Sequence, residues 1–86
     1  MPELSRFYGI IIKMYFSDHN PPHFHAEYES YKAEYDIKTL DRIVGTLPTR
    51  AHALVLEWAS LHKEELLSNW EKAQVPTILN KIEPLK

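Results

Sequence analysis

One short segment of the sequence concentrates the side chains best suited to chemistry. Three of the five histidines fall in the run Asp18-His19-Asn20-Pro21-Pro22-His23-Phe24-His25. Imidazole titrates near neutral pH and is a common metal ligand, so this density raises the question of a functional site. His23 and His25 are two positions apart in a predicted strand, which points both side chains to the same face. His19 lies in the adjoining loop, from which it can fold towards them.

Three interpretations of this segment remain open. The first is a transition-metal site with His23 and His25 as neutral imidazole ligands. Its remaining ligands would come from the loop histidine and nearby acids, namely His19, Asp18, Glu34 or Asp36. The second is acid–base catalysis, in which a histidine takes a proton from a ribose hydroxyl or a water and a cross-strand carboxylate orients it. Its candidate catalytic residues are His19, His23, His25, Glu34 and Asp36. The third is structural, with the histidines stacked on aromatic neighbours and hydrogen-bonded to acids on a surface strand.

The elements that must position these side chains are two strands of a hairpin. Residues 23–28 and 31–37 alternate between apolar and polar side chains, which is typical of a hairpin with one buried and one solvated face. A two-residue turn at Glu29-Ser30 sets the register. The predicted cross-strand pairs are Tyr28 with Tyr31, Glu27 with Lys32, His25 with Glu34 and His23 with Asp36.

The remaining elements complete an α+β fold. Alternation over Arg6–Phe16 predicts a strand inside the sheet, and Arg42–Leu47 predicts a short strand interrupted by Gly45. From Thr49 to about Gln74 the apolar spacing becomes helical. The prediction is therefore a three- to four-stranded antiparallel sheet packed against one long C-terminal helix, followed by an extended C-terminal tail. On that helix, Leu56 and Leu67 face away from the apolar stripe and predict a small exposed patch.

Composition limits the classes of protein that this chain can represent. With 86 residues and 44% hydrophobic content, we expect a single domain over residues 1–86. The absence of cysteine excludes disulfides and thiolate metal sites and suits a cytoplasmic location. No apolar segment approaches the ~20 residues needed to cross a bilayer, so no membrane association is expected. A formal net charge of −2 leaves nucleic-acid binding to a local basic patch. No cofactor-binding motif is present.

Four segments of the chain carry a family resemblance. Arg6–Phe16, Asp18–Ala26, Leu54–Ala59 and Lys81–Leu85 closely resemble a family of small, mostly bacterial proteins, domain of unknown function 4160 (DUF4160). The resemblance covers nearly the whole chain, and Asp-His-Asn-Pro-Pro-His-Phe-His is its most specific motif. One departure is Ser30, where relatives often have glycine, and this departure bears on the tight hairpin turn.

The resemblance implies a protein partner. Genes of this family often sit beside those of a second small family, domain of unknown function 2442 (DUF2442), in an arrangement that resembles a toxin–antitoxin operon. It implies that this chain is one half of a two-protein complex with a DUF2442-like partner. A homodimer is the alternative, which the small size of the core suggests. Expected binding surfaces are the sheet edge, the solvated sheet face and the Leu56/Leu67 side. The other function class is an enzyme, a small ribonuclease or metal-dependent hydrolase centred on His19, His23 and His25.

Overall fold

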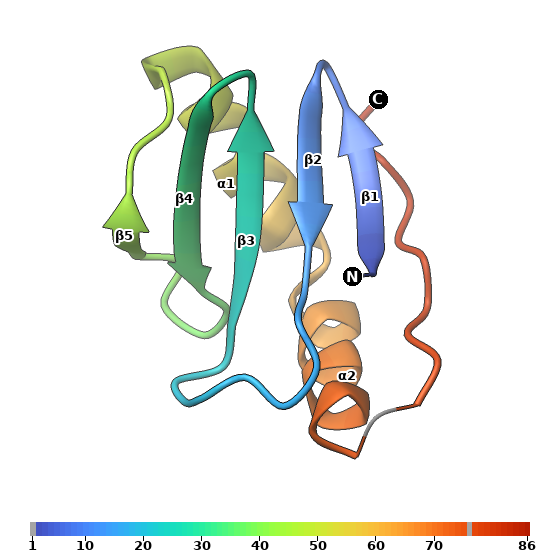
Figure 1. The fold of residues 1–86 in the computed structure, drawn as a ribbon. Coiled ribbons are helices and arrows are strands. Elements are labelled where there is room, and N and C mark those ends of the chain that lie inside the picture. The colour runs from blue at the N-terminus through green and yellow to red at the C-terminus, as the bar shows by residue number, and fades with distance from the viewer. Residues whose placement is uncertain (1, 76) are drawn as a thin grey trace.

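The computed structural model describes residues 2–75 and 77–86. Their strands are β1 Glu3–Phe7, β2 Ile10–Lys13, β3 His23–Tyr28, β4 Tyr31–Asp36 and β5 Arg42–Gly45, and their helices are α1 Thr49–Leu61 and α2 Lys63–Gln74. The strands form one antiparallel sheet in the order β1-β2-β3-β4-β5. Figure 1 shows α1 behind the middle strands and α2 beyond the lower ends of β2 and β3. The predicted α+β class is confirmed, but five strands and two helices replace the predicted three to four strands and one long helix.

The predicted strand over Arg6–Phe16 is in fact parts of two strands joined by a tight turn. Tyr8 and Gly9 have positive φ angles of 51° and 80°. Two central residues with positive φ form the turn that matches the twist of a two-residue hairpin. Phe7 and Ile10 pair directly across the turn, and both are buried. The apolar pattern continues on both sides of the turn, so alternation alone did not reveal it. β2 lies inside the sheet, as predicted, and β1 forms an outer strand.

The hairpin of β3 and β4 has the predicted register. All four predicted pairs are observed, Tyr28 with Tyr31, Glu27 with Lys32, His25 with Glu34 and His23 with Asp36. Glu29 has a φ of 54°, so the Glu29-Ser30 turn forms without glycine. The short predicted strand after this hairpin is β5, which ends at Gly45.

The predicted long helix is broken at His62, whose φ of −128° and ψ of 24° are not helical. In one straight helix, Trp58 and Trp70 would be about 120° apart around the axis, given 3.6 residues per turn. The break lets both tryptophans turn inward, and they are 0% and 6% exposed. Leu56 and Leu67 are partly buried against the core, so the predicted exposed patch is wrong. No helix in the described part of the chain could span a membrane.

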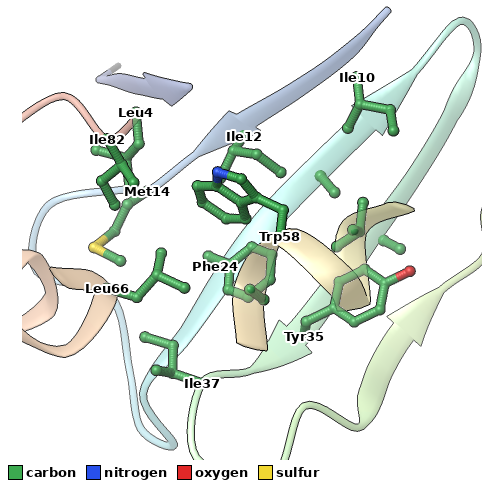
Figure 2. Close-up of a cluster of buried hydrophobic side chains, with 14 of the residues drawn as sticks. Leu4, Ile10, Ile12, Met14, Phe24, Tyr35, Ile37, Trp58, Leu66 and Ile82 are labelled. Carbon is green, nitrogen blue, oxygen red and sulfur yellow. The ribbon is translucent and has the colours of Figure 1, made fainter. Parts of the chain in front are cut away.

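The core lies between the sheet and α1, and the C-terminal tail closes it. Figure 2 shows Trp58 of α1 among apolar side chains of the sheet, including Phe24. The Trp58 indole Nε1–H donates to the Glu83 carbonyl at 2.8 Å. The Ile82 N–H donates to the Leu4 carbonyl at 2.8 Å, which fixes the extended tail beside β1 (Figure 1). The predicted extended tail is therefore observed, and it covers one edge of the sheet.

Candidate metal centre

The loop between β2 and β3 is tied to the elements around it. The Ser17 N–H donates to the Ala73 carbonyl near the end of α2 at 2.9 Å. The Ile37 N–H donates to the Pro22 carbonyl at 3.0 Å, which extends the β3–β4 pairing into the loop. Asp18 follows Ser17 directly, so these ties hold its carboxylate over the beginning of β3.

The Asp18 carboxylate lies against both strand histidines. Its Oδ2 is 3.0 Å from His23 Nε2 and 3.3 Å from His25 Nε2. The two imidazole centroids are 5.2 Å apart. One ligand atom from each of the three residues lies within 4.8 Å of the other two. The three side chains therefore converge on a common space.

His23 is buried, although the sequence pattern placed it on the solvated face of the hairpin. It is 2% exposed, because the Trp70 ring of α2 lies 5.2 Å from its centroid and the loop covers its other side. Its Nδ1 is 2.7 Å from the Pro21 carbonyl oxygen. A carbonyl can only accept, so Nδ1 carries the proton and donates it. In the neutral ring, Nε2 then bears a lone pair directed at the centre.

The His23 Nε2 atom lacks a hydrogen bond among the described residues, even though Asp18 Oδ2 is 3.0 Å away. An unprotonated Nε2 has no hydrogen to donate to this oxygen, so two lone-pair-bearing atoms face each other here. Two ligand atoms of one metal ion lie close together without a hydrogen bond between them, because the lone pair of each points at the ion. A buried polar atom with no partner costs about 1–3 kcal/mol, which an ion would relieve.

Asp18 is held in its ionised form. Partial burial raises the pKa of this carboxyl group, but several contacts act against it. The His19 N–H donates to Oδ1 at 2.9 Å, and His25 Nε2 lies within hydrogen-bond distance of Oδ2, at 3.3 Å. These contacts, and the positive charge that His23 and His19 carry when they are protonated, lower the pKa of Asp18 below its ordinary value. A deprotonated carboxylate is the form that binds a cation.

Glu34 closes the centre from β4. Its Oε1 is 3.5 Å from His23 Nε2, and its Oε2 is 4.0 Å from His25 Nδ1. Tyr15 packs its ring edge-on against His25 at 4.4 Å and limits the rotation of that imidazole. Glu34 thus faces the common space with Oε1, while its Oε2 lies beyond hydrogen-bond distance of His25 Nδ1.

Two of the predicted site residues take no part in this convergence of ligand atoms. The His19 side chain is 85% exposed, its Nδ1 is 3.1 Å from Asp18 Oδ1 and its ring centroid is 5.7 Å from that of His23, so it flanks the cluster at the surface. Asp36 pairs with His23 in the backbone register, but its Oδ1 accepts the N–H groups of Lys38 and Thr39 at 2.7 and 3.0 Å. Its carboxylate caps the following turn instead of meeting the histidines.

The donor set fits a divalent transition metal. Two imidazoles and a carboxylate form the protein side of many catalytic sites that keep a coordination position open. Ligand atoms about 2.0–2.1 Å from a tetrahedral ion are roughly 3.3 Å apart. The separations of 3.0 and 3.3 Å from Asp18 Oδ2 match this spacing.

Comparison with known proteins places the chain in a family. A family model described as domain of unknown function (DUF4160) matches residues 9–71. The chain belongs to this family. No curated protein and no solved structure matches it. The part matched by the DUF4160 model runs from the β1–β2 turn into α2, so it contains Asp18, His23, His25, Glu34 and Trp70.

Sequence reasoning missed two residues that shape this centre in the DUF4160 chain. Trp70 lies within the segment predicted as a helix and was not named as a site residue, yet it covers His23. Tyr15 lies within the segment predicted as the first strand and was not named either, yet it packs on His25. Tyr15 lies two residues beyond β2, in line with the strand that pairs with β3, so extending that pairing would have placed it near His25. No sequence signal joins Trp70 to the loop, because the helix break decides where its ring lies.

Proposed function

We propose that this protein is a metal-dependent hydrolase whose ion is held by Asp18, His23 and His25. The proposal rests on the state of one atom, His23 Nε2. This nitrogen is buried, its lone-pair state is set by the Pro21 carbonyl, and it lacks a hydrogen bond among the described residues. Bonding of the outer ring nitrogen to a backbone carbonyl is a common way to orient a metal-ligating histidine. Three protein ligands leave a coordination position for water, as in catalytic zinc sites.

The arrangement supports a simple hydrolytic step. A divalent ion lowers the pKa of a bound water to near 7. Glu34 Oε1, which lies 3.5 Å from His23 Nε2, would take the proton of that water. The water oxygen would bond to the electrophilic atom of an ester while the bond to the leaving oxygen breaks. Glu34 would then return the proton to that oxygen, so that the leaving group departs as an alcohol and the carboxylate is restored.

Metal removal and replacement test this proposal. The purified protein is stripped with a chelator, reloaded with Zn²⁺, Mn²⁺ or Fe²⁺, and assayed on carboxylate and phosphate nitrophenyl esters. We expect activity only after reloading. His23→Gln should weaken metal binding by at least ~100-fold, since loss of an outer-shell partner alone costs 10–100-fold. His52→Gln is the matched control, because His52 bonds the Tyr35 hydroxyl and not the centre. Hydrolysis that survives the chelator, or equal metal affinity in both variants, would contradict the proposal.

A second candidate function is binding of a partner protein through β5, and one observation favours it. β5 is an outer strand, and all four of its residues are exposed, including Ile43 at 44% and Val44 at 52%. The tail covers β1 at the opposite edge, so β5 is the edge open to an added strand. We propose a small DUF2442-like protein as the occupant, in a pair of the toxin–antitoxin kind that the family resemblance implies.

Co-expression with the neighbouring gene product tests this second candidate. We expect the two proteins to co-elute in size-exclusion chromatography, and Ile43→Lys should abolish co-elution. Ile78→Lys is the control, since Ile78 is 89% exposed but lies in the tail. A DUF4160 chain that elutes alone, with a mass above 10.1 kDa, would indicate a homodimer instead. Co-elution unaffected by Ile43→Lys would remove β5 from the interface.

A further inference from the structure

A hollow of about 110 Å³ adjoins the metal centre on the face of the sheet opposite α1. Residues of β3 and β4 line it, together with Tyr15 from the segment after β2 and Val44 of β5. His25 and Glu34 line it at the end nearest the centre, and Lys32 lines it further along the strands. The centre and the hollow therefore share two side chains, so a molecule in the hollow lies next to the ion site.

The charges around this hollow leave one cation uncompensated. Lys13 Nζ bonds both carboxylate oxygens of Glu27, at 3.1 and 3.2 Å. Lys32 lies opposite Glu27 in the register, but none of the ion pairs among residues 2–75 and 77–86 includes it. With a divalent ion bound, Asp18 and Glu34 together balance its charge. The ammonium group of Lys32 is then the charge left over, and it favours an anion.

The size of the hollow restricts what that anion is. It has room for a few water-sized groups, which suits one phosphoryl or carboxylate group and not a whole nucleoside. A phosphoryl group has enough oxygens to contact an ion and an ammonium group at the same time, and lysine binds phosphate as a point charge. The rest of the molecule would extend past Tyr15 and Val44 over the open rim.

Resting on the proposed metal-dependent hydrolysis, we propose that the substrate is a phosphate ester whose phosphoryl group occupies this hollow. One phosphoryl oxygen faces the ion at the His25 end, and another pairs with Lys32. Attack by the hydroxide oxygen on phosphorus forms the new P–O bond, and the bond to the ester oxygen breaks. Lys32 is a substrate-binding residue in this scheme and has no part in holding the metal.

Binding of inorganic phosphate to the Co²⁺-loaded protein tests the assignment, because the visible spectrum of Co²⁺ reports changes in its ligands. We expect phosphate to perturb the spectrum and acetate to bind much more weakly. Lys32→Met should weaken phosphate binding roughly tenfold, as expected for loss of a charge-assisted contact, and should leave Co²⁺ affinity unchanged. Lys81→Met is the control with the same charge change, because Lys81 lies in the tail beside β1 at the other edge of the sheet.

The outcomes separate this inference from the proposed function. A protein that fails to bind Co²⁺, Zn²⁺ or Fe²⁺ overturns both. A protein that binds the ion, but whose phosphate affinity is the same in Lys32→Met and Lys81→Met, overturns the phosphate site and leaves the metal centre standing. Acetate binding as tight as phosphate binding also overturns the phosphate-ester assignment.

Discussion

Substitution of Gly45, the last residue of β5, tests how closely β5 approaches β4 beside the hollow. Its φ is +75°, and a Cβ added there would lie 2.1 Å from the Lys32 carbonyl oxygen. Gly45 pairs with Ala33 of β4, so the clash falls on backbone and rotation of a side chain cannot relieve it. Left-handed backbone costs alanine about 1–2 kcal/mol. Moving β5 away also breaks the Thr46 N–H to Lys32 carbonyl hydrogen bond, worth about 1 kcal/mol. We expect Gly45→Ala to lower the free energy of unfolding by roughly 2–3 kcal/mol.

Urea unfolding followed by tryptophan fluorescence measures this loss. Gly9→Ala is the matched control, because Gly9 has a φ of +80° but its added Cβ would meet only the Tyr28 side chain, at 3.3 Å. That variant should show the backbone cost alone, about 1–2 kcal/mol. If Gly45→Ala costs no more than Gly9→Ala, the close approach of β5 to β4 is wrong. The position of Val44 at the hollow would then be wrong as well.

Two further predictions concern pH and metal. Burial raises the pKa of Tyr35, so above the ordinary tyrosine pKa of about 10 the unfolded chain loses its phenol proton before the folded one does. The free energy of unfolding should therefore fall as pH rises through this range, and urea titrations at each pH should show a smaller fall for Tyr35→Phe. Equal slopes of this free energy against pH in the two proteins would contradict the burial of Tyr35. Zn²⁺ at about 100 times its Kd should stabilise the protein by about 2.7 kcal/mol, or roughly 10–20 °C in Tm for a chain of this size. In thermal melts, Zn²⁺ should raise the Tm of His23→Phe hardly at all. A rise in Tm equal to that of the unaltered protein would show that His23 is not a ligand.

The register of the β3–β4 hairpin could be predicted from the sequence in full. Its alternation has one apolar face, and a slip of one residue would expose that entire face, so the register was strongly specified. The Tyr8-Gly9 turn could not be read in the same way, since apolar residues continue on both sides of it. The break at His62 left no local signal such as proline or glycine, because the burial of both Trp58 and Trp70 decides it. These two misses account for the extra strand and the extra helix.

The candidate site was predictable in composition but not in arrangement. Spacing brought His23 and His25 to one side of β3, and the register brought Glu34 towards them. The path of the loop decides that Asp18 contacts both histidines, and its ties to α2 are tertiary contacts. Asp36 was a reasonable candidate by register, but the amide groups of the following turn compete for its carboxylate and bind it first.

The most direct measurement of the central claim is an anomalous difference map from crystals grown with Zn²⁺ and recorded at the zinc edge. We expect one peak per chain, about 2.0–2.2 Å from His23 Nε2, His25 Nε2 and an Asp18 carboxylate oxygen. The Pro21 carbonyl should still accept the His23 Nδ1–H. A map with no peak between these three side chains, or with zinc only at exposed histidines such as His19, would contradict the account.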